Sequence, residues 1–226
     1  MNALINYLKR TGSRRFVMMV AGNVFAGMGI SIFKLSRLGN DPFSGMTMAL
    51  SACTKIPYAR FQVLFNLVLL VVEIALGREY IGAGTVVNAV LLGYFVTFFN
   101  YVWMGLGIVP AVLWQQVVTV FAGVIVCSFG LSLYQTSDVG VAPYDSLALI
   151  MHKRLPKFSY FWHRMFWDAL SAVVCFTAGG IVGLGTVVSA FGFGPFIHFF
   201  NVHATNKLVG KKTYGGRESN DRTETI

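Results

Sequence analysis

Six runs of about twenty predominantly apolar residues restrict what this chain can fold into. A helix rises about 1.5 Å per residue, so a run of roughly 20 residues can cross a hydrocarbon layer about 30 Å thick. The sequence therefore predicts an all-α transmembrane fold with about six membrane-spanning helices. The expected spans lie at residues 14–36, 58–77, 81–104, 108–135, 158–178 and 181–203.

The distribution of charge supports a membrane protein and argues against a nucleic-acid partner. The chain is 55% hydrophobic and 12% charged, and it carries a formal net charge of +9. No Lys or Arg occurs between Glu79 and His152, and the cations gather beside the apolar runs. This pattern is typical of multi-pass proteins that follow the positive-inside bias. We expect a protein of the plasma or inner membrane, surrounded by the lipid bilayer, with cytoplasmic N- and C-termini.

Two short segments, 42–54 and 143–152, separate the first span from the second and the fourth from the fifth. Each opens with a proline, Pro42 or Pro143, a residue favoured in the first turn of a helix. Helices of this length reach only about 16–20 Å, which is too short to cross a bilayer alone. We therefore expect two short helices that are re-entrant or lie in the membrane interface.

The chain matches itself at a constant offset of 101 residues. Matched pairs include Gly29, Ser36, Gly39 and Pro42 with Gly130, Ser137, Gly140 and Pro143, and the Gly-x-Gly-Thr block at 82–85 with that at 183–186. We interpret this as two sequence repeats, about 14–104 and about 108–203. Three spans per repeat predict an inverted 3+3 arrangement, whereas a parallel 4+4 arrangement follows if the short helices cross.

These repeats form one expected transmembrane domain, residues 1–203. Residues 204–226 are polar, charged and glycine-bearing, and we interpret them as a disordered cytoplasmic tail.

The same motifs resemble a known family. The glycine- and serine-bearing first span ends in Leu38-Gly39-Asn40-Asp41-Pro42-Phe43, and its second copy continues as Val139-Gly140-Val141-Ala142-Pro143-Tyr144-Asp145. With the two Gly-x-Gly-Thr blocks, these segments are similar to the YczE/YyaS/YitT group of small bacterial integral membrane proteins, and to its YczE branch most closely. The resemblance covers about residues 20–203. It implies a polytopic bacterial membrane protein with a transport or regulatory role.

Polar residues inside apolar spans are energetically expensive and are therefore candidates for function. Asp168 falls near the middle of the fifth span, with Arg164 one turn earlier and His163 beside it. These residues could form a proton- or cation-responsive group, or Arg164 and Asp168 could be a structural pair at i and i+4. Asp145 could bind a cation at the second short helix, or could only complement its helix dipole.

The remaining candidates come from the matched positions of the two repeats. Backbone N–H groups after Pro42 and Pro143 could receive an anion, but Asp41 and Asp145 would repel it, which favours a cationic or zwitterionic ligand. Asn100 and Asn201 are symmetry-related polar residues that could contact a solute or form interhelical hydrogen bonds. Glu73 lies one turn from Gly77, and we expect it to reach the membrane surface.

These patterns favour a small-solute secondary transporter or permease with a site between the two repeats. The alternative is a membrane scaffold or regulator that acts through a partner. No nucleophile set, metal cluster or phosphate loop is recognisable, so we expect no enzyme, metal or cofactor. The sequence leaves open a homo-oligomer or a protein partner.

Overall fold

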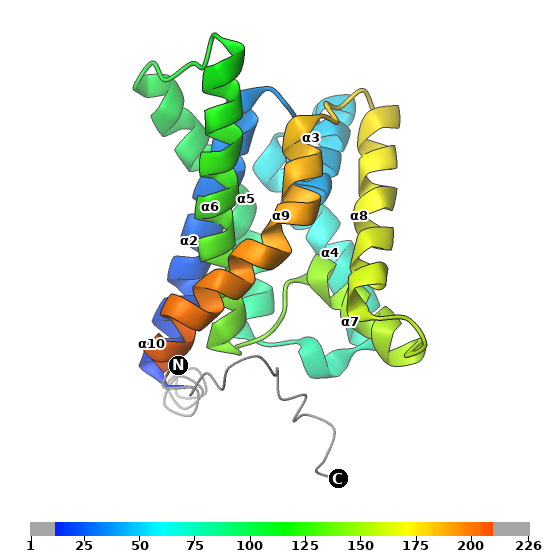
Figure 1. The fold of residues 1–226 in the computed structure, drawn as a ribbon. Helices are drawn as coiled ribbons and strands as arrows, with labels where there is room; N and C mark the ends of the chain where they lie inside the picture. Colours follow the sequence, from blue (N-terminus) through cyan, green and yellow to red (C-terminus); the bar gives the residue numbers. More distant parts are fainter. Residues whose placement is uncertain (1–11, 210–226) are drawn as a thin grey trace.

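The computed structural model describes residues 12–209, and within this range all regular secondary structure is helical. The long helices stand side by side in one bundle (Figure 1). The elements in chain order are α2 (Ser13–Ser36), α3 (Pro42–Thr54), α4 (Tyr58–Leu76), η1 (Arg78–Tyr80), α5 (Ala83–Gly105), α6 (Leu113–Ser137), α7 (Pro143–Arg154), α8 (Tyr160–Thr177), α9 (Leu184–Phe200), η2 (Asn201–Thr205) and α10 (Asn206–Val209). The predicted all-α class is confirmed.

Five helical segments are long and apolar enough to cross a membrane. They are α2, α4, α5, α6 and the continuous stretch from α9 into α10, Leu184–Leu208. The sixth predicted run forms α8, which has 18 residues but carries His163, Arg164 and Asp168 within its first half. Those polar residues keep α8 out of this apolar group, although it lies parallel to its neighbours (Figure 1).

The centre of the bundle is the crossing of α2 and α6, which run in opposite directions. Glycines allow the two backbones to approach closely. A methyl group added at Gly22 would lie 2.7 Å from the carbonyl oxygen of Gly130, and one at Gly123 would lie 3.3 Å from that of Gly29. Small residues at such a crossing are a common means of packing helices in membranes.

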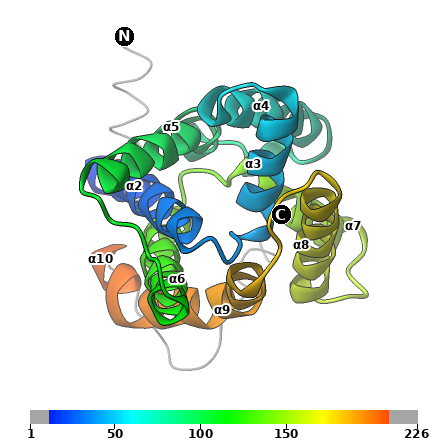
Figure 2. The ribbon, with the colours of Figure 1, turned by 90° about the horizontal axis from the view of Figure 1, so that it is seen from above.

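The two short helices lie inside the bundle and point toward opposite ends. Most side chains of α3 are buried, and Figure 2 shows this helix between α4 and α8. Figure 1 shows α3 in one half of the bundle and α7 in the other. Pro42 and Pro143 occupy the first helical turns as expected. Because most of α3 is enclosed by other helices, it is not an interfacial helix lying on the surface.

The loop before each short helix accepts a backbone hydrogen bond from a residue at the start of a long helix in the other half. The 101-residue offset relates these two hydrogen bonds. The N–H of Gly84 donates to the carbonyl oxygen of Val139 (2.8 Å), and the N–H of Gly185 donates to that of Leu38 (2.8 Å). Each loop turns through a glycine with positive φ, Gly39 at 100° and Gly140 at 118°, a conformation that glycine adopts without steric cost. The loop before α3 is therefore hydrogen-bonded to the start of α9, and the loop before α7 is hydrogen-bonded to the start of α5.

The last long helix is interrupted, and its end corrects one sequence boundary. Pro195 lies inside α9, and a π-helical turn, Asn201–Thr205, follows it. A proline inside a helix removes a backbone hydrogen bond and favours a bend. The predicted tail at 204–226 begins too early, because Thr205 is fully buried and α10 continues to Val209. Residues 210–226 of that predicted tail lie outside the described part.

Candidate functional site

The two short helices meet at their first turns near the middle of the bundle. The ring of Phe43 stacks on the ring of Tyr144, with centroids 4.2 Å apart and planes inclined by 18°. These two residues are also matched by the 101-residue offset. The Asp41 carboxylate caps α3 by accepting a hydrogen bond at Oδ1 from the N–H of Ser44 (3.0 Å). The contact brings Asp41 of the first half toward Asp145 of the second.

Arg164 on α8 joins the start of α7 to its own helix. Its Nη1 forms an ion pair with Oδ1 of Asp145, and its Nε donates to Oδ2 of Asp168 (3.2 Å). Tyr144 donates its hydroxyl to Oδ1 of Asp168 (2.7 Å), and the Arg164 guanidinium carbon lies 4.9 Å from the centre of the Tyr144 ring. The structural i, i+4 pair of the sequence interpretation is therefore present, within a larger cluster that includes Asp145.

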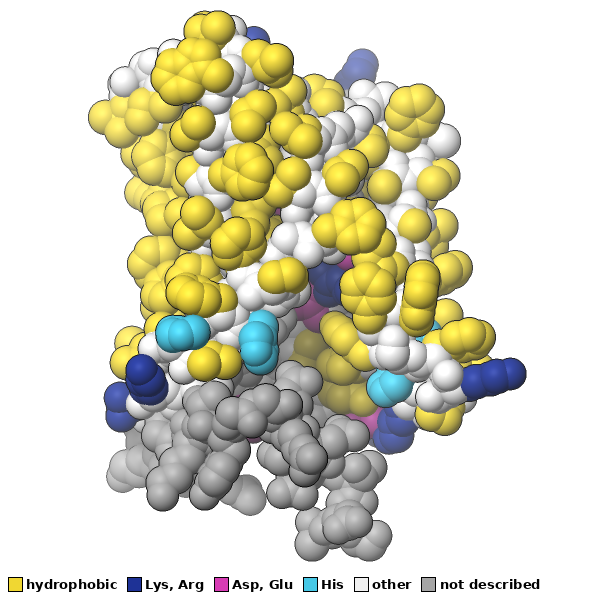
Figure 3. Space-filling model, viewed as in Figure 1, with side chains coloured by type: hydrophobic (Ala, Val, Ile, Leu, Met, Phe, Trp, Pro, Cys, Tyr) yellow, Lys and Arg dark blue, Asp and Glu magenta, His cyan; other side chains and the backbone are white. Residues whose placement is uncertain are grey.

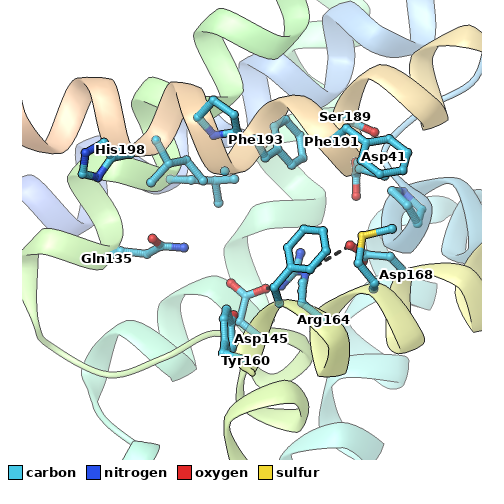
Figure 4. A pocket seen from close by; sticks show the side chains of 18 of the residues that line it. Asp41, Gln135, Asp145, Tyr160, Arg164, Asp168, Ser189, Phe191, Phe193 and His198 are labelled. Atoms are coloured by element: carbon cyan, nitrogen blue, oxygen red, sulfur yellow. Dashed lines mark hydrogen bonds and ion pairs between the residues drawn. The ribbon is translucent and has the colours of Figure 1, made fainter. Parts of the chain in front are cut away.

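A cavity of about 480 Å³ adjoins this cluster. Its lining comes from α3, α6, α7, α8 and α9, and we call it the central cavity. In Figure 4 the side chains of α9 face those of α8 across it, with Asp41 near Ser189 and Phe191. In Figure 3, basic and acidic side chains are visible in the depth of a hollow between apolar surfaces. This volume is within the usual range for small-molecule sites, about 300–1,000 Å³.

A second cavity of about 680 Å³ adjoins the central one. Both are lined by Gln135, Asp145 and Tyr160. The second cavity also contacts Arg15 at the start of α2 and Glu79 in η1. Together the two cavities extend from the charged cluster toward the end of the bundle where α2 begins (Figure 1).

Most of the predicted site residues meet at the central cavity. Its lining includes Asp41, Pro42, Asp145, Arg164, Asp168 and Asn201. The sequence offered these residues from four separate segments, and the structure brings them together.

Three predicted residues lie elsewhere. Pro143 is buried and starts α7 without lining the cavity. A ring nitrogen of His163 lies 3.1 Å from the carbonyl oxygen of Leu155, so this side chain joins α8 to the preceding loop. Asn100 points to the Sδ atom of Met104 on its own helix (Nδ2–Sδ 3.5 Å). These three residues therefore do not line the central cavity.

Asn201 shows why the matched asparagines differ. Its Oδ1 accepts hydrogen bonds from the hydroxyls of Ser132 (2.7 Å), Thr136 (3.1 Å) and Thr205 (3.2 Å). This network joins α6 to the π-helical turn, which agrees with the interhelical alternative, although Asn201 also borders the cavity. Asn100 forms no such network, because the offset gives it the same residue type without the same neighbours.

Sequence reasoning missed Glu73, which was expected to reach the surface. The residue is fully buried on α4, and neither carboxylate oxygen has a hydrogen-bond partner among residues 12–209. Its neighbours on α4 include the exposed Leu67, Val71 and Ile74. The available signal was helical phase, because Glu73 falls on the same side of α4 as the buried Gln62 and Asn66.

An ion pair outside the apolar helices links η1 to α7. The Lys153 ammonium donates to Oε1 of Glu79 at 2.7 Å, and this hydrogen bond holds the pKa of the Glu79 carboxyl below its ordinary value. Both side chains are well exposed. Within residues 12–209, no group of three or more His, Cys, Asp or Glu side chains is arranged to hold a metal ion.

The helical bundle and its long apolar helices define a polytopic membrane protein. A profile described as "Family of unknown function (DUF6198)" matches residues 13–202, and the chain belongs to that family.

Three relatives match most of the chain. It is 21% identical over 206 residues to the "Uncharacterized membrane protein YczE" of Bacillus subtilis, covering 88% of this chain and 92% of that one. It is 25% identical over 208 residues to the "Uncharacterized protein YyaS" of the same organism (86% and 96%). An "Uncharacterized protein" of Haemophilus influenzae is 25% identical over 177 residues (77% of each chain). The resemblance inferred from the motifs is thereby confirmed. No solved structure matches the chain.

Proposed function

We propose that this protein is a secondary transporter or permease for a small solute, which binds in the central cavity. The observation that carries the proposal is that both halves of the chain line one charged cavity inside a membrane bundle. Asp41 comes from the first half, whereas Asp145, Arg164 and Asp168 come from the second. Charged side chains within a membrane domain commonly mark a solute or ion pathway.

The proposal includes an inverted duplication of the chain. Three observations support it: the short helices point to opposite ends, α2 and α6 run antiparallel, and the loop hydrogen bonds recur at an offset of 101 residues. Many transporters place the substrate site near the membrane midplane, between two such repeats and beside broken helices. Motion of one repeat against the other would expose that site to each side in turn.

We further propose a plasma-membrane location with both termini in the cytoplasm. The beginning of α2 and the end of α10 lie at the same end of the bundle (Figure 1), beside Arg14, Arg15 and Lys207. The positive-inside bias assigns such an end to the cytoplasm. A cysteine at position 55 is then labelled by an impermeant thiol reagent from outside, and one at position 78 from the cytoplasm. Labelling in the reverse order contradicts this orientation.

Uptake into proteoliposomes tests the transport proposal. Radiolabelled solutes of four classes, cationic, zwitterionic, anionic and neutral, are offered with and without a pH gradient or a sodium gradient. We expect uptake of at least one class, strongly reduced by Asp168→Asn and unchanged by Arg60→Gln, whose exposed side chain lines neither cavity. If correctly oriented, folded protein transports none of them, the proposal is rejected and a partner-dependent scaffold takes its place.

A further inference from the structure

Acidic side chains outnumber basic ones on the lining of the central cavity. Asp41, Asp145 and Asp168 line it, and among its lining residues Arg164 is the one Lys or Arg. The Oδ2 atom of Asp41 is buried and has no hydrogen-bond partner among residues 12–209. Buried charges in proteins are normally paired, because an unpaired one loses hydration without compensation. The cavity therefore favours a positively charged occupant.

The single guanidinium of the cavity is already engaged. Arg164 contacts Asp145 through Nη1 and Asp168 through Nε, and its charged plane lies over the ring of Tyr144. An anionic ligand would have to displace one of these carboxylates and remain near the others. Like charges brought together at this depth are costly. The arrangement disfavours an anion and leaves Asp41 as the acid without a basic partner.

The rest of the lining is suited to an organic cation more than to a hydrated metal ion. Apolar and aromatic side chains predominate on α8 and α9: Phe161, Met165, Phe191, Phe193 and Ile197. Aromatic faces attract cations, and quaternary ammonium groups are recognised in this way. Calcium, by contrast, requires about six to eight oxygen ligands. The hollow between α8 and α9 opens on an apolar face of the molecule (Figure 3).

From these observations we infer that the ligand of the central cavity is an organic cation, an ammonium group that carries apolar substituents. The cationic group lies beside Asp41 and Asp145, and the apolar substituents lie against the aromatic side chains of α8 and α9. This inference rests on the proposed function for its site and adds the chemical class of the solute. Two kinds of molecule carry such an ammonium group, a free solute and a lipid with an ammonium head group.

Calorimetric binding of choline tests the inference with a matched uncharged probe. The intact chain is placed in phosphatidylglycerol nanodiscs and titrated with choline or with 3,3-dimethylbutan-1-ol, which has the same shape without the charge. We expect choline to bind at least about tenfold more tightly, a difference of about 1.4 kcal/mol. Equal affinities for the two probes, or no binding of choline, would overturn the inference.

The variant Asp41→Asn removes one charge while preserving the local fold. Asparagine is as good an N-cap as aspartate, so the hydrogen bond to the N–H of Ser44 can remain. We expect this variant to bind choline at least about tenfold more weakly, whereas Arg60→Gln, which is exposed and lines neither cavity, binds it as the wild type does. Wild-type affinity in Asp41→Asn would reject the assigned site. Size-exclusion chromatography verifies that both variants remain folded.

A second lipid composition shows whether the bound ammonium group belongs to a lipid or to a free solute. The uptake measurement separates this inference from the proposed function. Weaker choline binding in nanodiscs that contain phosphatidylethanolamine indicates that a lipid ammonium group occupies the cavity; unchanged binding indicates a free solute. Choline binding in a protein that transports nothing would support the inference and reject the transporter. Uptake of another solute class, without choline binding, would do the reverse.

Discussion

The starts of α3 and α7 share a backbone design and differ in chemistry. Each helix begins at a proline after a loop with a positive-φ glycine. In α3 the acid precedes the proline and caps the helix, whereas in α7 the acid, Asp145, follows it and pairs with Arg164. The two halves are thus alike in backbone at the loops before these helices, and they differ in the side chains that border the cavity.

The helices that pack beside these starts differ in the same way. The 101-residue offset places Val63 and Leu67 of α4 opposite Arg164 and Asp168 of α8. Nearly all the ionisable groups of the central cavity therefore come from the second half, and Asp41 is the contribution of the first. The second half supplies nearly the whole lining, charged and apolar alike, and the first half supplies Asp41 and Pro42.

The largest effect is expected from Arg164→Gln. The substitution leaves Asp145 and Asp168, with side chains 13% and 7% exposed, without their cation. Breaking a buried ion pair by removing one partner costs about 3–5 kcal/mol. We expect a large fall in the thermal midpoint measured by fluorescence-detected size exclusion. The matched change in the first half, Val63→Ala, should cost about 1 kcal/mol or less. Similar midpoints for the two variants would contradict the asymmetry.

A smaller effect is expected where the halves behave alike. A methyl group at Gly183 would lie 2.6 Å from the carbonyl oxygen of Leu38, and one at Gly82 would overlap that of Val139. Gly183→Ala and Gly82→Ala should each lower the free energy of unfolding by about 1–3 kcal/mol, because the backbone must shift to make room for the methyl group. Gly194→Ala is the control, since nothing lies within 4 Å of its added methyl group. If only one of these two variants is destabilised, the contacts that hold the two loops are not equivalent.

Glu73→Gln should change stability little or raise it. Neither carboxylate oxygen of Glu73 accepts a hydrogen bond from residues 12–209, so the amide loses no contact and removes a buried acid. Asp145→Asn, by contrast, breaks an ion pair and should lower the thermal midpoint. The thermal midpoints of Glu73→Gln and Asp145→Asn together show whether an unpaired acid and an ion-paired acid contribute differently to stability. A lower midpoint for Glu73→Gln would show that this carboxyl has a stabilising partner, for which the neighbouring Ser146 is the candidate.

The smallest effect concerns the exposed ion pair between η1 and α7. Because Lys153 lowers the pKa of Glu79 in the folded protein, the pair stabilises at pH values above the ordinary glutamate pKa, about 4.3. This contribution is lost as the pH falls through the lowered folded-state pKa. Lys153→Gln should raise the pKa of Glu79 in an NMR titration, with almost no change in the thermal midpoint near pH 7. An unchanged pKa would show that the pair does not form in solution.

The sequence predicted the helices and much of the site because both depend on local or repeated patterns. Apolar runs locate the long helices, and Pro42 and Pro143 mark the starts of α3 and α7. The offset identifies equivalent positions without revealing their neighbours, which is why Asn100 and Asn201 looked alike. The prediction that Glu73 reaches the membrane surface is wrong. It depended on the distance of Glu73 from the end of α4, whereas the helical phase places this residue on the buried face.

The cavity itself could not be predicted, because it depends on tertiary arrangement. Its lining combines residues from Asp41 to Asn201 and is bordered by the interrupted helix α9. Tyr160 and Gln135 line both cavities, yet nothing in their local sequence distinguishes them from residues near the ends of other helices. Such residues become recognisable only when several helices are placed together.

Alternating access to the central cavity is the central claim, and a cysteine at Gln135 tests it most directly. Gln135 is exposed and lines both cavities. In a variant whose three native cysteines are replaced, Gln135→Cys is offered an impermeant maleimide from one side of the membrane or the other, with Lys55→Cys as a control that reports a single face. The account predicts labelling of Gln135→Cys from both sides, slowed by the transported solute. Labelling from one side alone, under every solute and gradient tested, would contradict it.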